Sequence, residues 1–188
     1  SMINTAHKYG VKVIVDVVAN HLANTKGNDL SKEIPEYLRD TAYWHDITVN
    51  TTNWNDRYDV TQHCMGGLPD LNTGNEDIQQ FVLEFLKDCV DMGVDGFRFD
   101  AAKHIETPMD DASFASDFWP TVVGGAETYA DEKYGKDLYI YGELLDTTGG
   151  VGLSAYTQYM AITDNSWGNS LRKNIEADKA ALSAGYDK

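Results

Sequence analysis

Short apolar segments alternate with amphipathic ones along most of this chain. Residues 11–18 (Val-Lys-Val-Ile-Val-Asp-Val-Val) are rich in β-branched side chains and almost continuously apolar, which is typical of a strand covered on both faces. Residues 94–100 and 138–143 predict two further strands, and residues 158–163 predict a weaker fourth. A helix is expected before the first strand, ending at Gly10.

A long amphipathic helix is predicted between the first two strands. Its apolar side chains recur three and four positions apart, at Ile78, Phe81, Val82, Phe85, Leu86, Cys89 and Val90. Gly93 follows at the position where a glycine commonly ends a helix. Leu171, Ile175 and Leu182 indicate one more helix after the last strand.

The alternation of strands and helices predicts an α/β fold with a parallel sheet, either doubly wound or closed into a barrel. One connection is too long for an ordinary loop of such a fold. More than fifty residues, rich in Asn, Thr, Trp and Tyr, separate the first strand from the helix that begins near Glu76. We therefore interpret residues 22–72 as an inserted subdomain.

Composition and charge narrow the classes of partner. The chain has 188 residues, 42% of them hydrophobic, and carries 15 Lys and Arg against 30 Asp and Glu, a formal net charge of −15. This is enough apolar material for a globular core, but the acidic balance argues against binding nucleic acid or an anionic membrane surface. No apolar run suits a membrane helix, and the first residues lack the features of a signal peptide. Neutral ligands and cations remain as expected partners.

Polar side chains gather at the carboxyl ends of the predicted strands. They are Asn20, His21, Arg98, Asp100, Lys103, His104 and Glu143. In parallel α/β folds, ligands bind and catalysis takes place at this edge of the sheet. One acidic residue at a strand end commonly caps a helix, but coincidence at three strands favours a functional site.

Asp100 and Glu143 have the chemistry of a glycosidase pair. Two carboxylates that face one cleft can divide the work, one attacking the anomeric carbon and the other protonating the departing oxygen. Arg98 lies two residues before Asp100, on the same face of the strand, and would keep that carboxylate ionised. The alternative is an ion pair between Arg98 and Asp100 that only ties two loops together.

Oxygen donors near the insert suggest a cation. Asn20 ends the first strand and Asp70 closes the insert, and both carry the hard oxygen ligands that Ca²⁺ prefers. A cation bound between them would connect the insert to the sheet. No EF-hand loop is present, so this hypothesis depends on composition alone.

Four segments resemble, in order and spacing, the signature regions of the α-amylase family of retaining glycoside hydrolases. They are residues 16–21 (Asp-Val-Val-Ala-Asn-His), 68–72 (Leu-Pro-Asp-Leu-Asn), 96–104 (Gly-Phe-Arg-Phe-Asp-Ala-Ala-Lys-His) and 141–145 (Tyr-Gly-Glu-Leu-Leu). The remainder, to Lys188, is compatible with the next strand and helix, so the resemblance covers nearly the whole chain.

The resemblance implies part of a TIM (β/α)8 barrel, about strands 3 to 6, with a subdomain inserted after strand 3. Residues 1–21 would contain barrel strand 3, residues 22–72 the inserted B-type subdomain, and residues 73–188 the barrel from helix 3 to about helix 6.

The resemblance also assigns roles in catalysis. Asp100 matches the catalytic nucleophile, Glu143 the general acid and base, and Arg98 the arginine that positions the nucleophile. His21, Lys103 and His104 match sugar-contacting positions.

The same resemblance implies a structural Ca²⁺ ion. Asn20, Asp70 and the backbone carbonyl of His104 match its ligands, and the carbonyl of Thr61 is a further expected ligand. The resemblance also implies a secreted protein, which is consistent with calcium being plentiful outside cells.

On this mapping, the expected activity is endo-acting hydrolysis of α-1,4-glucosidic bonds in starch-like glucans with retention of configuration. The Lys103-His104 pair and the Leu-Pro-Asp-Leu string favour it over another α-glucan enzyme of the family, such as a transglycosylase or an α-glucosidase. A non-catalytic, calcium-stabilised glucan-binding module is the alternative from another class. Large aromatic residues could stack on glucose rings or serve only as packing: Trp44, Trp54, Tyr58 and Trp119.

One family signature is missing. The Phe-x-x-Asn-His-Asp type segment that supplies a third carboxylate does not occur, and the His45-Asp46 pair precedes the nucleophile, in the wrong order to replace it. Since a complete barrel takes about 250 residues, we expect the chain to be its middle section. Alone, it should be inactive, and either poorly stable or self-associated through exposed barrel edges.

Overall fold

Four strands form one parallel sheet in the computed structural model, which describes residues 1–23, 34–145 and 150–186, with side chains as far as Ala180 in the last helix. In sheet order they are β1 (Ile14–Val17), β4 (Gly96–Phe99), β5 (Tyr139–Gly142) and β6 (Ala161–Ile162). Every neighbouring pair is parallel. The predicted α/β class and the predicted order of strands are therefore confirmed.

Helix α3 (Glu76–Met92) is the amphipathic helix that the sequence predicts. The Asn75 side chain accepts hydrogen bonds from the backbone amides of Asp77 and Ile78 and so caps its first turn. Gly93 ends it with a φ of 98°, a left-handed conformation that favours glycine.

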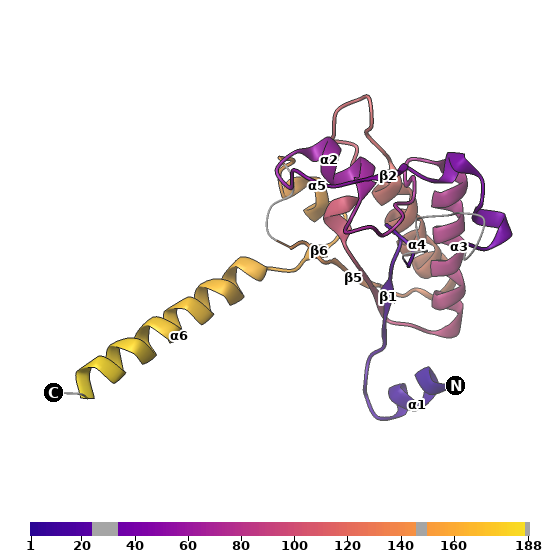
Figure 1. Cartoon of the computed structure of the whole chain (residues 1–188). Coiled ribbons are helices and arrows are strands. Elements are labelled where there is room, and N and C mark those ends of the chain that lie inside the picture. Colours follow the sequence, from indigo (N-terminus) through magenta and orange to yellow (C-terminus); the bar gives the residue numbers. More distant parts are fainter. Residues whose placement is uncertain (24–33, 146–149, 187–188) are drawn as a thin grey trace.

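Helix α4 (Phe118–Tyr134) packs beside α3 on one face of the sheet (Figure 1). The family resemblance implies a helix in this region, but the local apolar pattern did not predict it. Its apolar residues are concentrated in its first half, and Gly124 and Gly125 interrupt the pattern in its middle. A Cβ atom at Gly125 would lie 3.0 Å from the Leu83 side chain, so the same glycine that weakens the helical pattern allows close packing against α3.

The main core lies between the sheet and these two helices. Phe97 and Phe99 of β4 are fully buried, and the Phe99 ring meets the ring of Trp119 edge-on with centroids 5.2 Å apart. Trp119 in turn contacts Tyr156 of the short helix α5 (Ser154–Thr157). Aromatic packing thus connects β4, α4 and α5 below the edge of the sheet where the predicted site residues lie.

The segment predicted as an insert contains two 3-10 turns, two short strands and a helix. These elements are the turns Glu36–Leu38 and Thr41–Tyr43, β2 (Asp46–Asn50), α2 (Arg57–Gln62) and β3 (His63–Cys64). A second, smaller apolar cluster packs here, formed by Ile34, Leu38, Trp44, Leu71 and Ile78. In Figure 1 this segment lies across the carboxyl end of the sheet.

The two terminal helices differ in how they meet the rest of the chain. Helix α1 (Met2–Lys8) precedes β1 as predicted, and Gly10 follows it with a φ of 70°. Helix α6 (Asn165–Tyr186) extends away from the sheet (Figure 1). Its predicted apolar positions Leu171 and Ile175 are exposed, whereas the side chain of Leu182 lies outside the described residues. Among the described helices, none combines the length and apolarity needed to span a bilayer.

The prediction that β1 is covered on both faces was wrong. Ile14 is 41% exposed, and Val18, just beyond the strand, is 49% exposed. Within the described residues β1 pairs only with β4, so one of its edges has no neighbour.

Candidate active site

The parallel register brings the predicted catalytic residues to one edge of the sheet. Val17 of β1 stands beside Phe99 of β4, which stands beside Gly142 of β5. Two backbone hydrogen bonds continue this ladder past the strand ends, because the Asp100 amide donates to Val17 O at 2.9 Å and the Glu143 amide donates to Phe99 O at 2.8 Å. Asp100 and Glu143 therefore leave neighbouring strands at the same level.

One guanidinium joins three carboxylates at this edge. Arg98 Nη1 lies 3.0 Å from Asp100 Oδ1 and 2.6 Å from Asp16 Oδ1, and Nη2 lies 2.9 Å from Glu143 Oε1. The hydrogen bond to Asp16 is the main reason that the pKa of Arg98 is raised, and the Asp100 and Glu143 carboxylates add to the effect. Arg98 is thus a fixed cation between the two predicted catalytic acids.

Asp16 was not among the predicted site residues. Its side chain belongs to β1, at the position directly beside Arg98 in the parallel pairing. The alignment of two strands that each carry one charged residue in an apolar run would have indicated this contact, but the pattern of either strand alone does not.

Of the predicted sugar-contacting residues, His21 lies beside the predicted nucleophile. His21 Nε2 lies 3.9 Å from Asp100 Oδ2; burial lowers the pKa of this histidine, and the nearby Asp100 charge partly opposes that effect. Lys103 is buried, and its Nζ donates to Leu145 O at 2.8 Å, beyond the end of β5.

His104 lies deeper than His21 and faces the insert. Its Nδ1 lies 2.8 Å from Val60 O in α2, and burial lowers its pKa to about 4. Trp54 of the insert meets the His104 ring edge-on, with centroids 5.7 Å apart, and Lys103 Nζ lies 5.3 Å from the Trp54 ring centroid. The insert thereby contacts the loop that follows β4.

The large aromatic residues divide into two groups. Trp44 and Trp119 are buried, so they serve as packing. Trp54 is 45% exposed and Tyr58 is 52% exposed, both in the insert. Of the aromatic residues considered from the sequence, these two leave ring surface open to a ligand.

The predicted calcium ligands Asn20 and Asp70 are in direct contact. Asn20 Nδ2 donates to Asp70 Oδ1 at 2.7 Å, whereas Asn20 Oδ1 is buried and has no hydrogen-bond partner among the described residues. Asp70 is completely buried, which raises its pKa well above the usual value, although the Asn20 hydrogen bond opposes this. A buried acid beside an unpartnered oxygen suits a bound cation.

The other two predicted ligands, Thr61 and His104, are related through Val60. The Thr61 carbonyl accepts a hydrogen bond from Gln62 Nε2 at 3.2 Å. Thr61 is fully buried and follows Val60, the residue whose carbonyl contacts the His104 ring. In the part of the chain that the structure describes, no three His, Cys, Asp or Glu side chains are grouped to hold a metal. A cation here would therefore depend on amide and carbonyl oxygens with a single carboxylate, a donor set that suits Ca²⁺ better than zinc.

Arg57 was missed by the sequence analysis and connects the insert to the loop after β4. Its guanidinium makes a bidentate pair with Asp110, with Nε–Oδ1 at 2.7 Å and Nη2–Oδ2 at 2.9 Å. It also donates to the carbonyls of Lys103 and Ile105, and the Tyr156 hydroxyl donates to the same two carbonyls. These contacts fix the backbone on both sides of His104.

His45 and Glu106 form a second buried connection that the sequence did not reveal. His45 Nδ1 lies 2.7 Å from Asp70 Oδ2, and its Nε2 lies 3.2 Å from Glu106 Oε1. Burial raises the pKa of Glu106 to about 7 and lowers that of His45, which the Glu106 charge opposes. The His45-Asp46 pair, already excluded as the third catalytic carboxylate by its order, thus has a different set of contacts.

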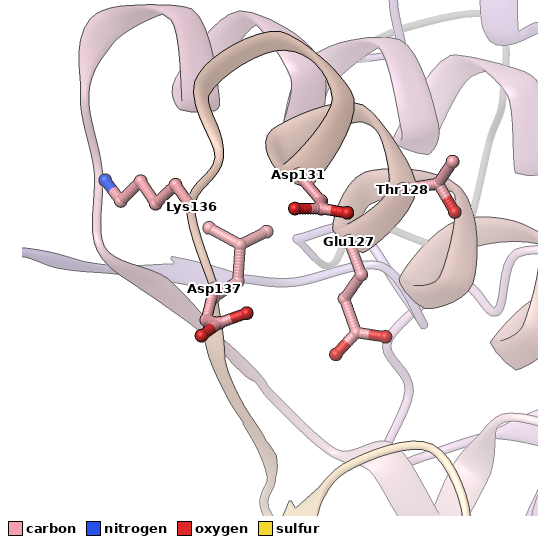
Figure 2. Close-up of a pocket in the computed structure, with 6 residues that line it drawn as sticks. Glu127, Thr128, Asp131, Lys136 and Asp137 are labelled. Atoms are coloured by element: carbon pink, nitrogen blue, oxygen red, sulfur yellow. The ribbon is translucent and has the colours of Figure 1, made fainter.

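A separate hollow of about 440 Å³ lies at the amino end of β5, opposite the edge that carries Asp100 and Glu143. Figure 2 shows Glu127 and Asp131 projecting from α4 toward the segment with Lys136 and Asp137. None of the predicted site residues lines it, so it is distinct from the candidate active site.

Comparison with known proteins identifies the family. Residues 1–163 match the family model described as Alpha amylase, catalytic domain. The alpha-amylase of Clostridium acetobutylicum is 38% identical over 94% of this chain and 23% of its own length, and that of Butyrivibrio fibrisolvens is 39% identical over 96% of this chain and 20% of its own. The chain thus spans less than a quarter of these curated relatives.

A solved structure gives the same fold. A substituted variant of alpha-amylase I from Eisenia fetida, in complex with maltohexaose, superposes with a TM-score of 0.69 at 23% identity, covering 90% of this chain and 36% of that one. The parallel sheet is accordingly a section of a (β/α)8 barrel. The family model, the two relatives and the arrangement of Arg98, Asp100 and Glu143 lead to one conclusion: this chain belongs to the alpha-amylase family of glycoside hydrolases.

Proposed function

We propose that the protein containing this chain hydrolyses internal α-1,4-glucosidic bonds of starch-like glucans with retention of configuration. The observation that carries the proposal is the shared guanidinium, because Arg98 holds Asp100 and Glu143 together at the carboxyl edge of the sheet. Three carboxylates against one guanidinium leave a surplus of negative charge at this edge of the sheet. A positively charged transition state suits this surplus.

The two carboxylates act in two steps. Asp100 attacks the anomeric carbon and forms a covalent glycosyl ester, while Glu143 gives its proton to the departing glycosidic oxygen. Glu143, now ionised, takes a proton from water, and the resulting hydroxyl attacks the same carbon and releases Asp100. Two inversions at one carbon give net retention.

The substrate would lie along the edge formed by the β4 loop and the insert. His21 is close enough to Asp100 to contact the sugar that reacts, and Lys103 with His104 would contact neighbouring sugars. The exposed ring of Trp54 stands beside both of the latter. A neutral glucan also suits a chain whose formal net charge is −15, and maltohexaose, the ligand in the Eisenia fetida complex, is the natural probe.

We propose further that Asn20, Asp70 and the carbonyls of His104 and Thr61 hold a Ca²⁺ ion. Support comes from the unpartnered Asn20 Oδ1 and from the complete burial of the Asp70 carboxylate. When bound, the ion would neutralise Asp70 and connect the insert to β1 and the β4 loop. Calcium is abundant outside cells, so we also propose a secreted protein.

Replacement of the nucleophile tests the catalytic proposal. In the full-length protein, Asp100→Asn should lower the turnover of amylose by at least about 10³-fold, because no group remains to form the ester. The matched control is Asp16→Asn, which removes another carboxylate from the same guanidinium but no reacting group. Activity of the Asp100→Asn variant close to that of the Asp16→Asn variant would contradict the assignment, provided that circular dichroism shows both to be folded.

Product analysis separates hydrolysis from related activities. Mixed maltooligosaccharides released from amylose with the α configuration would support an endo-acting amylase, whereas glucose alone would indicate an α-glucosidase and rearranged chains a transglycosylase. Saturable binding of maltohexaose without cleavage would favour a glucan-binding module. Light scattering of the isolated 188-residue chain would test the proposed self-association through exposed sheet edges.

A further inference from the structure

One imidazole bridges two buried carboxylates from different parts of the chain. His45 contacts Asp70, at the end of the insert, through Nδ1 at 2.7 Å, and Glu106, in the loop after β4, through Nε2 at 3.2 Å. The side chains of Asp70 and Glu106 are each 1% exposed and that of His45 is 10% exposed. The contacts therefore lie in a medium of low dielectric, where their geometry has a strong effect.

Backbone contacts fix the position of His45 beside Asp70. The His45 amide donates to the Asp70 carbonyl at 3.1 Å, so the two residues are joined through both main chain and side chain. The preceding Trp44 forms a bridge with Leu71, and its indole Nε1 donates to Leu38 O at 2.7 Å. The imidazole consequently approaches the carboxylate from a buried and well-packed segment.

Glu106, at the other end of this bridge, is also held in place by hydrogen bonds. The Glu106 carboxylate accepts hydrogen bonds from Thr73 Oγ1 and from Gln62 Nε2. Thr73 follows the insert and Gln62 belongs to α2, so the position of Glu106 depends on residues outside its own loop. Glu106 in turn restrains the His45 ring from rotating away from Asp70.

We propose that His45, supported by Glu106, is the residue that positions the Asp70 carboxylate for Ca²⁺. This inference rests on the calcium site proposed above. Both Asp70 oxygens are contacted, Oδ1 by Asn20 and Oδ2 by His45, each at 2.7 Å. These two contacts set the rotation of the carboxylate and leave its remaining lone pairs for a cation beside Asn20 Oδ1. Loss of such an orienting partner typically weakens metal binding by about 10–100-fold.

Calcium titration of the full-length protein tests the proposal. After removal of metal with a chelator, isothermal titration with Ca²⁺ should give a dissociation constant about 10–100-fold higher for His45→Ala than for the unsubstituted protein. His45→Asn should bind much as the unsubstituted protein does, because an asparagine amide stands close to the position of Nδ1. His45→Gln, whose amide reaches toward the position of Nε2, should bind as weakly as His45→Ala.

His63 supplies the matched control. It lies in the same insert, and its Nδ1 contacts Asp59 Oδ1 at 2.6 Å, the same kind of pair without Asp70. His63→Ala should leave the calcium dissociation constant unchanged. If His45→Ala does not fold, the comparison of His45→Asn with His45→Gln carries the test.

The outcomes separate the two proposals. Normal calcium affinity of the His45→Gln variant, or equal weakening by His63→Ala, would overturn the positioning role while leaving the calcium site intact. Absence of calcium binding by the unsubstituted protein would overturn the calcium site and the positioning role together, without bearing on the catalytic role of Asp100.

Discussion

The section of parallel sheet and the insert are stabilised by different kinds of contact. Around the sheet, the buried side chains of β4, α3 and α4 form one continuous apolar core, with Phe97, Phe99 and Trp119 at its centre. In the insert the apolar cluster is small, and buried polar groups make the connections to the rest of the chain.

The difference affects how each region tolerates change. Apolar burial is non-directional, so a core accepts substitutions that conserve volume. Buried ion pairs require their partners, because removing one member leaves the other charge without compensation. The insert should therefore be sensitive to single polar substitutions, whereas the sheet section should be sensitive to changes of volume and backbone geometry.

The largest effect is expected at Gly96 in β4. A Cβ atom there would lie 1.9 Å from the carbonyl oxygen of Tyr139, its partner in β5, so Gly96→Ala must disrupt the pairing of the two strands. We expect a loss of more than about 4 kcal/mol or no folded protein. Gly124→Ala in α4 is the control, because among the described residues no atom outside its own helix backbone and chain neighbours lies within 4 Å of its Cβ position. It should stabilise by about 0.5–1 kcal/mol. Similar urea midpoints for the two variants would refute the prediction.

Two substitutions by methionine test directly whether the insert depends on polar pairs and the sheet section on apolar packing. Arg57→Met leaves Asp110, whose side chain is 1% exposed, without its bidentate partner, and should cost about 3–5 kcal/mol. Leu86→Met conserves volume in the fully buried core of the sheet section and should cost less than about 1.5 kcal/mol. Urea unfolding of both variants gives the comparison. A larger loss for Leu86→Met would reverse the proposed difference between the regions.

The difference between apolar packing around the sheet and polar pairs in the insert also explains which features the sequence could predict. The strands, α3 and the edge with Asp100 and Glu143 follow from local patterns, since apolar periodicity and strand ends are visible in short windows. The local pattern missed helix α4 because Gly124 and Gly125 interrupt its apolar periodicity, and Gly125 is required for close packing against Leu83 of α3. That cause lies in tertiary structure and leaves no local signal.

Local sequence patterns could not predict the polar contacts between the insert and the rest of the chain, for a related reason. Arg57 and Asp110 are 53 positions apart, and no periodicity relates them. His45, Asp70 and Glu106 likewise meet only in the folded chain, although Asp70 alone was identified through its signature segment. To predict such long-range pairs, one needs either the structure or the register of the strands. The contact of Asp16 in β1 with Arg98 in β4 is a further example.

Acid should weaken the insert through Asp59. Burial alone would raise the pKa of this carboxyl, but contacts from His63, Thr52 and the Asn53 amide lower it to about 2. A depressed pKa in the folded state adds stability above the unfolded value near 4, which is lost as the pH falls from about 4 to about 2. The loss should be about 1–2 kcal/mol.

Proteolysis of the insert measures this loss. The rate of cleavage within the insert should rise as the pH is lowered from 6 to 2, and Asp59→Asn should flatten that rise. An unchanged profile in the variant would exclude Asp59 as the cause.

The smallest effect is expected at an exposed polar cluster between α3 and α4. Asp91, 39% exposed, contacts Lys133 Nζ at 2.9 Å and the hydroxyls of Tyr129 at 2.9 Å and Tyr134 at 2.8 Å. Water and salt screen such contacts, so Asp91→Asn should leave the urea midpoint almost unchanged, and added salt should remove any remaining difference. A loss as large as that of Arg57→Met would mean that the sheet section also depends on specific polar pairs. The contrast between the two regions would then reflect where charged residues happen to lie rather than how each region is stabilised.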